Sequence, residues 1–483
     1  MPSAPSTACA RKPTAAKSRN SSIQGPLRFR AKYCPPDGRP RNRLSRYVTE
    51  CGTRFQFVGP VGIEPAPAHM LRAIDTPGVR WLASTPEARE GSRIMRFARA
   101  GRAVLVGAAA LAAIYGVAYA VAWTRTDNSG LARSIAWGEA DVDDHTRFPS
   151  RAVPASGTAY VYEKAEGYPD GLPATIAVPG GKKLGELLAA SETTAFLVIK
   201  DDRLVYEHYF NGSSHDAVQT SFSVAKSFAS ALLGAAIADG KIGSVDDPVT
   251  RYLPELLERD PRFADIAIRH LVTMSSGLHY EEYGLPWSDD ALTYYDADLR
   301  GLALRKTRVE EPPGLRFHYN NYNPLLLGMI LERATGQSVA AYLSEKIWKP
   351  VGAEADASWS IDSNEHGFEK MESGVNARAI DFAKLGSLYL HRGEFNGRRI
   401  LPAEWIDNST APALPTGLAF SSGYGRWWWT HGAESLGAYY SARGNKGQFV
   451  FVFPSKGLVV TRHGRDYGGV DWSAVAEAVA SGF

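Results

Sequence analysis

Cysteine is scarce in this 483-residue chain. Only Cys9, Cys34 and Cys51 are present, and all three precede residue 52. A disulfide framework needs paired cysteines within the folded part, and a thiolate metal site needs them clustered at short spacings. The sequence therefore excludes both for residues 52–483, and it leaves the redox compartment open.

The chain also has little excess charge, with a formal net charge of +3 at pH 7. Residues 1–94 contain 16 Lys or Arg and 6 Asp or Glu, a net of +10, so residues 95–483 carry about −7. A folded part that binds nucleic acid normally carries a basic excess. We therefore expect no nucleic-acid partner.

One long stretch lacks charge. Residues 103–123 are uncharged and follow Arg96, Arg99 and Arg102. About 20 apolar residues are enough to cross a bilayer as a helix, and arginines in front of the helix favour a cytoplasmic N-terminus. The pattern predicts a membrane anchor at residues 103–123, with the following part in the bacterial periplasm or cell exterior. A cleaved signal sequence is the alternative, because residues 118–122 contain small-x-small sites.

Residues 1–94 lack a sustained helical or strand period and are rich in Pro, Arg, Ser and Ala. This composition predicts a disordered basic segment. The peptide at residues 55–65 resembles one that recurs when non-coding RNA genes are translated by mistake. Met95 is therefore an alternative start of the protein.

Residues 124–184 are polar with scattered Pro and Gly, which predicts a linker leading into a folded domain at residues 185–483. The strand-like runs 194–200 and 203–210 flank Asp201-Asp202 and predict a hairpin. Two further strands are predicted at 449–454 and 458–462, and helices at 228–237, 268–277, 325–334, 376–390 and 471–481. One sheet then takes strands from both ends of a single α/β (α+β) domain.

Ser223 and Lys226 stand three residues apart at the start of an apolar helix. Positions i and i+3 share a helix face, so the lysine amine can reach the serine hydroxyl. A desolvated lysine can activate a serine nucleophile, and the helix N-terminus can stabilise an oxyanion. A chain of this length contains Ser-x-x-Lys by chance roughly once or twice, so the motif needs support from other residues.

Tyr319 and Asn321 lie directly before the helix predicted at 325–334. A Tyr-x-Asn motif on such a loop can present a phenol and an amide to one pocket. The phenol needs a neighbouring cation to ionise near neutral pH, and we expect Lys226 to supply it. Packing of these aromatic residues is the simpler alternative.

The segments Ser-Val-Ala-Lys at 223–226, Tyr-Asn-Asn at 319–321 and Gly-Asn-Lys-Gly-Gln at 444–448 resemble, in order and spacing, the serine β-lactamase and penicillin-binding-protein superfamily. The resemblance covers about residues 185–480. It is strongest to the branch of class C β-lactamases, D-alanyl-D-alanine carboxypeptidases, related esterases and 6-aminohexanoate-dimer hydrolases. It implies a β-lactamase/transpeptidase-like fold, with an antiparallel sheet flanked by helices and a helical subdomain.

The resemblance also implies an acyl-enzyme mechanism. Ser223 attacks a carbonyl, Lys226 and Tyr319 move the proton, and Asn321 holds the lysine or the substrate. Backbone N–H groups of Ser223 and of the Gly444-Asn445 strand edge bind the oxyanion. Water then hydrolyses the acyl-enzyme, so neither a metal nor an organic cofactor is expected.

One departure from the family pattern bears on the substrate. Members that recognise penicillin usually carry Lys-Thr-Gly or His-x-Gly on the last motif strand, where this chain reads Ser-Ala-Arg-Gly-Asn-Lys-Gly over residues 441–447. We therefore expect a serine hydrolase acting on a small-molecule ester or small linear amide. The alternatives are a penicillin-binding or sensing module, or a D-alanyl peptidase or β-lactamase, acylated at the same serine.

Overall fold

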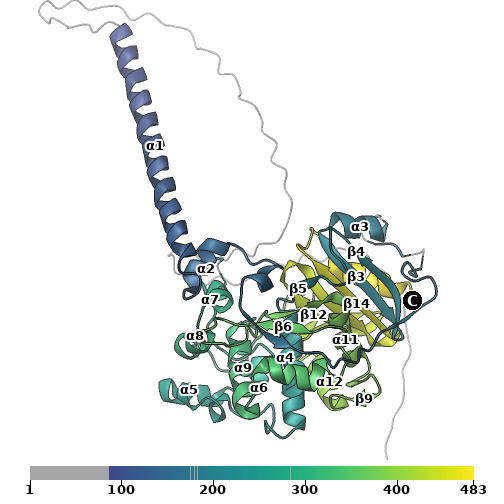
Figure 1. The fold of residues 1–483 in the computed structure, drawn as a ribbon. Helices are drawn as coiled ribbons and strands as arrows, with labels where there is room; N and C mark the ends of the chain where they lie inside the picture. Colours follow the sequence, from purple (N-terminus) through teal and green to yellow (C-terminus); the bar gives the residue numbers. More distant parts are fainter. Residues whose placement is uncertain (1–85, 174–175, 179, 182, 283) are drawn as a thin grey trace, which may run out of the picture. The chain divides into compact units, whose positions relative to one another are not determined.

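The structure, a computed structural model, describes residues 86–483 except 174, 175, 179, 182 and 283. The helices are α1 (Pro86–Trp123), α2 (Gly130–Trp137), α3 (Leu184–Ala190), α4 (Val224–Ala238), α5 (Pro254–Arg259), α6 (Ile268–Val272), α7 (Asp289–Tyr295), α8 (Leu299–Lys306), α9 (Tyr322–Thr335), α10 (Val339–Leu343), α11 (Ala379–Leu390), α12 (Ala403–Thr410) and α13 (Trp472–Ser481). Figure 1 shows their arrangement.

The main sheet has eight strands. They are β2 (Glu163–Lys164), β3 (Thr193–Lys200), β4 (Arg203–Tyr209), β10 (Gly423–Tyr424), β11 (Trp429–Ala433), β12 (Gly437–Gly444), β13 (Gln448–Phe453) and β14 (Leu458–Gly464). Their order is β10-β11-β12-β13-β14-β3-β4-β2, and only the β2–β4 pair is parallel. Because β14 pairs with β3, the prediction that one sheet takes strands from both ends of the domain is confirmed.

The predicted hairpin forms β3 and β4. Asp201 and Asp202 both have positive φ, 49° and 57°. A two-residue turn of this kind has the twist that suits a hairpin, and aspartate tolerates positive φ better than most residues. The local sequence is therefore enough to determine this pairing.

The two faces of the sheet bury different helices. Along β3, Leu197 packs into a cluster that contains Leu232 of α4 and Leu385 of α11. Its neighbour Phe196 packs on the other face, in a cluster with Val475 of α13. Successive strand residues point to opposite faces, so the apolar run at residues 195–199 of β3 is covered on both sides.

A second sheet has the order β1-β6-β7-β5. Its strands are β1 (Ser150–Val153), β5 (Val218–Thr220), β6 (Ala357–Ser360) and β7 (Val375–Arg378), while β8 (Glu394–Phe395) and β9 (Arg398–Arg399) form a separate hairpin.

The helix predicted at 376–390 begins only at Ala379, because the residues before it belong to strand β7. Asn376 lies in β7, where its amide donates to Ser358 Oγ and Ser360 Oγ at 3.1 and 2.9 Å. These tertiary contacts override the helical pattern of the first residues.

Residues 124–184 do more than link the domain to what precedes it. They contain α2, β1 and β2, and β1 pairs with β6 along its whole length. Val142 is fully buried, and its carbonyl accepts a hydrogen bond from Thr220 N at 3.0 Å. The segment thus packs on the strand that leads to Ser223.

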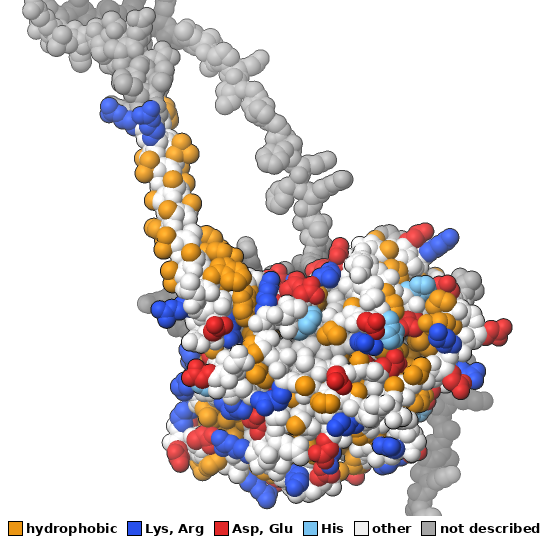
Figure 2. Space-filling view, viewed as in Figure 1, with side chains coloured by type: hydrophobic (Ala, Val, Ile, Leu, Met, Phe, Trp, Pro, Cys, Tyr) orange, Lys and Arg blue, Asp and Glu red, His pale blue; other side chains and the backbone are white. Residues whose placement is uncertain are grey.

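Helix α1 contains the predicted membrane span. Its part Arg99–Trp123 is 25 residues long with a mean hydropathy of 2.1, enough to cross a membrane by length and composition. Hydrophobic side chains follow one another along it (Figure 2), and Val104, Leu111 and Ile114 are each about two-thirds exposed. The helix begins at Pro86, within the predicted disordered segment, and residues 1–85 lie outside the described residues.

Candidate active site

Ser223 lies where strand β5 turns into helix α4. It is the N-cap residue of α4, and Phe222 before it has a positive φ of 45°. Ser221 holds this turn, because its N–H donates to Val375 O at 2.8 Å and its hydroxyl to Ser373 O at 3.0 Å. A strained residue of this kind persists only when its surroundings fix it, and such residues cluster at functional sites. The turn places the half-buried Ser223 side chain at the N-terminus of a buried helix.

Lys226 lies one turn further along α4 and is only 1% exposed. Its Nζ donates to Ser223 Oγ at 2.9 Å and to the backbone carbonyl of Glu372 at 2.9 Å. Burial lowers the pKa of Lys226 to about 7, and the carboxylates of Glu372 and Glu282 oppose this shift. A lysine with such a pKa is partly neutral near pH 7 and can accept a proton from a hydroxyl.

Tyr319 lies beside this pair. Lys226 Nζ is 4.9 Å from the centroid of its ring, and Trp429 stacks on the ring with centroids 5.8 Å apart and an interplanar angle of 16°. Burial raises the pKa of Tyr319 above its ordinary value, while the Ser223 hydroxyl opposes the shift. The phenol is therefore neutral near pH 7, which differs from the expectation that Lys226 promotes its ionisation. A neutral phenol acts as a proton donor.

Asn321 lies on the same loop, but its contacts differ from those expected. Its Nδ2 donates to Tyr280 Oη at 2.9 Å, and its buried Oδ1 has no hydrogen-bond partner among the described residues. Lys226 is held by Ser223 and the Glu372 carbonyl instead. A role of Asn321 toward the substrate stays a prediction.

Gly444 ends β12 beside the Ser223 turn. A Cβ at this position would lie 2.3 Å from the carbonyl oxygen of Ser221 and 3.2 Å from Phe222 Cβ. The pairing of β11 with β12 reaches only from Gly437 to Ser441, before this end of the strand. Asn445 follows as an exposed residue. The strand end therefore lies directly beside the nucleophile turn, and the role of Gly444 and Asn445 in an oxyanion site stays a prediction.

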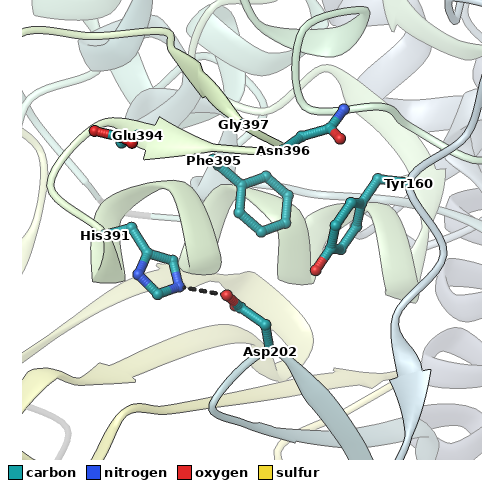
Figure 3. Close-up of a pocket in the computed structure, with 7 residues that line it drawn as sticks. All are labelled: Tyr160, Asp202, His391, Glu394, Phe395, Asn396 and Gly397. Carbon is teal, nitrogen blue, oxygen red and sulfur yellow. Dashed lines mark ion pairs between the residues drawn. The ribbon is translucent and has the colours of Figure 1, made fainter.

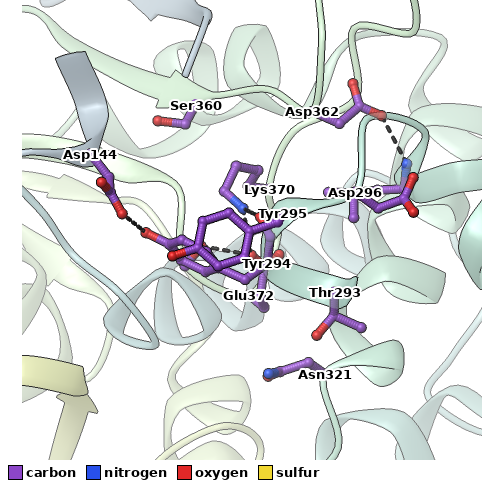
Figure 4. A network of polar contacts seen from close by, with 12 residues as sticks. Asp144, Thr293, Tyr294, Tyr295, Asp296, Asn321, Ser360, Asp362, Lys370 and Glu372 are labelled. Atoms are coloured by element: carbon purple, nitrogen blue, oxygen red, sulfur yellow. Dashed lines mark hydrogen bonds and ion pairs between the residues drawn. The ribbon is translucent and has the colours of Figure 1, made fainter. Parts of the chain in front are cut away.

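A buried polar network next to the site was not predicted from the sequence (Figure 4). Lys370 and Glu372 form an ion pair at 3.2 Å, and Tyr294 donates its hydroxyl to Asp144 at 2.8 Å. Tyr294 also stacks on Phe222, with ring centroids 6.2 Å apart. These residues belong to segments far apart in the chain, and no local motif marks them.

A separate surface cavity of about 720 Å³ is lined by Tyr160, Asp202, His391, Glu394, Phe395, Asn396 and Gly397. His391 Nε2 lies 2.7 Å from Asp202 Oδ2 (Figure 3), and this carboxylate raises the pKa of His391. None of the predicted catalytic residues lines the cavity.

Comparisons with known proteins agree with this geometry. The Beta-lactamase family model matches residues 183–480. The chain is 28% identical over 297 residues to the 6-aminohexanoate-dimer hydrolase of Paenarthrobacter ureafaciens, covering 58% of this chain and 74% of that protein. It is 33% identical over 131 residues to esterase EstB of Burkholderia gladioli, covering 24% of this chain and 32% of that protein.

Solved structures show the same fold. The structure of a putative 6-aminohexanoate-dimer hydrolase from Bacillus anthracis matches with a TM-score of 0.59 at 23% identity, covering 69% of this chain and 90% of that one. A putative beta-lactamase from Bacteroides dorei matches with a TM-score of 0.53 at 20% identity, covering 62% and 96%. The β-lactamase/transpeptidase-like fold expected from the sequence is thus confirmed.

Proposed function

The chain belongs to the Beta-lactamase family of serine hydrolases, and we propose that it cleaves an ester or a small linear amide through an acyl-enzyme on Ser223. One observation carries this proposal. The Nζ of a buried lysine, Lys226, lies 2.9 Å from Ser223 Oγ. This is the distance that direct proton transfer from the nucleophile requires.

The steps follow from the positions of these groups. Neutral Lys226 takes the proton of Ser223 as Oγ attacks the substrate carbonyl. Backbone N–H groups of Ser223 and of the Gly444-Asn445 strand end stabilise the oxyanion. Tyr319 donates its phenol proton to the leaving group and takes back a proton from the Lys226 ammonium. In the second half, neutral Lys226 accepts a proton from the water that attacks the acyl carbonyl. That proton returns to Ser223 Oγ as the bond between Oγ and the acyl group breaks.

The charges around β12 favour a substrate without a carboxylate at the position where penicillins present one. On the face of β12 toward α4 lie Tyr440 and Ala442, which pack in the same cluster as the helix. Arg443 points to the other face, 5.0 Å from the ring centroid of Phe449. Lys446 pairs with Glu139 at 2.7 Å. Arg443 thus lies on the face of β12 away from α4, and Lys446 is ion-paired, which supports an uncharged ester or linear amide.

We also propose that α1 anchors the enzyme in a membrane with the catalytic domain exported. The apolar part Arg99–Trp123 supports the anchor, and the arginines before it support the orientation. The substrate then reaches the enzyme from outside the cytoplasm.

Hydrolysis of 4-nitrophenyl acetate by the full-length chain in detergent tests the proposed chemistry. Ser223→Ala should remove nearly all activity. Ser230→Ala is the matched control, because Ser230 lies buried in the same helix and its hydroxyl has no hydrogen-bond partner among the described residues. Equal rates for Ser223→Ala and the unchanged chain would refute the proposal.

Comparing 4-nitrophenyl acetate with nitrocefin and D-alanyl peptides separates the proposed hydrolase from the related activities that share an acylated serine. A single burst of product without steady turnover would indicate a penicillin-binding or sensing module. Faster turnover of nitrocefin than of the ester would indicate a β-lactamase, and faster turnover of D-alanyl peptides would indicate a D-alanyl peptidase.

A further inference from the structure

Glu372 contacts the active site through its backbone and carries a buried carboxylate on its side chain. Its carbonyl accepts the hydrogen bond from Lys226, and the residue is 2% exposed. Lys370 Nζ lies 3.2 Å from its Oε1, and Ser373 Oγ donates to the same oxygen at 2.6 Å. Its Oε2 has no hydrogen-bond partner among the described residues. An ion pair thus lies next to the amine proposed to activate Ser223.

Aromatic rings enclose the lysine of this pair. Lys370 Nζ is 4.3 Å from the ring centroid of Phe148 and 4.0 Å from that of Tyr294. Tyr294 is fixed in turn by the hydrogen bond of its hydroxyl to Asp144, and both residues are visible beside Lys370 and Glu372 in Figure 4. Exclusion of water lowers the local dielectric constant, so a single charge acts strongly on its neighbours.

Ionisable groups face Lys226 from three loops. Glu372 comes from the loop before β7, Glu282 from the loop after α6, and the phenol of Tyr319 from the loop before α9. Glu282 is exposed, so solvent weakens its effect, whereas Glu372 is enclosed and is the stronger of the two carboxylates acting on Lys226.

We propose that the Glu372 carboxylate, held in an ion pair by Lys370, is a positioning group that sets the protonation equilibrium of Lys226. The inference rests on the proposed role of Lys226 as the base for Ser223. In this proposal the second buried lysine, Lys370, acts on the reaction only through Glu372 and does not touch the substrate.

The sign of each effect follows from electrostatics. Glu372→Gln keeps the side-chain shape and the backbone carbonyl but removes a negative charge, so the ammonium form of Lys226 is less favoured and its pKa falls. Lys370→Met leaves a buried carboxylate without its cation, and burial then favours the protonated acid. The negative charge is lost again, so Lys370→Met should shift Lys226 in the same direction. Because both changes act through one charge, their effects should not add.

An NMR titration of the full-length chain in detergent micelles tests this directly. Lysine is labelled with ¹³C at Cε, and the Lys226 signal is assigned by its loss in Lys226→Met. Glu372→Gln and Lys370→Met should each lower the midpoint by about one pH unit, a tenfold change in the protonation equilibrium. The double variant should shift no further than Glu372→Gln, and Lys370→Arg should keep the midpoint of the unchanged chain.

Lys384→Met is the matched control. Lys384 is also fully buried and pairs with Asp381 at 3.1 Å, so its loss disrupts an ion pair without altering the charges that face Lys226. A Lys226 midpoint that is unmoved or raised in Glu372→Gln would overturn the inference. The titration does not depend on turnover. If the chain shows no Ser223-dependent hydrolysis, the proposed function is refuted, but the titration still decides the role of Glu372.

Discussion

Gly444 lies against Ser221 so closely that no other residue fits without a shift. A Cβ at position 444 would lie 2.3 Å from the Ser221 carbonyl oxygen, well inside the contact distance of two heavy atoms. The backbone of the nucleophile turn and the end of β12 are thus in direct contact. This contact fixes the distance between Ser223 and the proposed oxyanion donors.

Gly444→Ala should therefore lower the activity far more than it lowers stability. The methyl group must displace either the strand end or the turn at Ser221, and small misplacements of catalytic groups are costly, about 10²-fold for 1 Å. Esterase kinetics together with thermal unfolding measure the two effects. Gly432→Ala in the neighbouring strand is the control, because a Cβ there meets no atom within 4 Å. Near-normal kcat/KM in Gly444→Ala would show that the contact is not needed.

The rate should depend on one group with a pKa about 7, the value to which burial lowers Lys226. The base must be neutral to accept the Ser223 proton, so kcat/KM should fall roughly tenfold per pH unit below that pKa and level off above it. Profiles between about pH 5 and 9 with 4-nitrophenyl acetate measure this. Lys226→Arg should be inactive at every pH because the guanidinium stays protonated. An acidic limb centred near the ordinary carboxylate range would instead indicate a Glu or Asp base.

Tyr319→Phe should lower kcat and leave KM nearly unchanged. The stacking on Trp429 keeps the ring in place, so the variant loses only the hydroxyl that passes the proton. Loss of a general acid or base typically costs about 10²–10⁴-fold. Tyr424→Phe serves as the control, since this ring lies 6.3 Å from that of Tyr319 but has no proposed role in proton transfer. A similar loss in both variants would point to packing rather than proton transfer.

Elements with strong local signals could be predicted from the sequence. The Asp201-Asp202 turn determines the β3–β4 hairpin. The helix predicted at 325–334 is present as α9, which Gly336, in the left-handed conformation at φ 71°, ends after Thr335. Ser223, Lys226 and Tyr319 do meet in the structure. This proximity was predictable because each of the three residues lies in a short motif at or just before the start of a helix.

Other parts depend on contacts between distant segments. The Lys370–Glu372 pair and the enclosing Phe148 are separated by more than 200 residues in the chain, so no local pattern links them. Burial of a charged residue is itself unexpected from composition, since lysine and glutamate are rarely buried unless paired. The prediction of a linker at 124–184 has the same cause. Strand β1 of this segment pairs with β6, which lies about 200 residues later in the chain.

Phe148→Ala should destabilise the protein although Phe148 lies outside the part that matches the family model. The ring is 4% exposed and packs edge-on against Trp137 at 5.0 Å. Truncation of a buried aromatic side chain costs about 3–5 kcal/mol. Urea unfolding followed by tryptophan fluorescence measures the loss. Leu131→Ala, at a 46% exposed position, should change the free energy of unfolding little, and equal midpoints for the two variants would show that the segment is not packed.

The chain should sediment with membranes and resist extraction by alkaline carbonate, because Arg99–Trp123 is long and apolar enough to span a bilayer. A double substitution of Leu111→Arg and Ile114→Arg should release it, since each arginine near the centre of a span costs roughly 2.5–3.5 kcal/mol on insertion scales. Val161→Arg, at a position 67% exposed outside α1, controls for added charge. N-terminal sequencing of the membrane fraction then separates an uncleaved anchor from a processed signal sequence. A mature protein that begins after residue 120 and remains soluble would contradict the anchor.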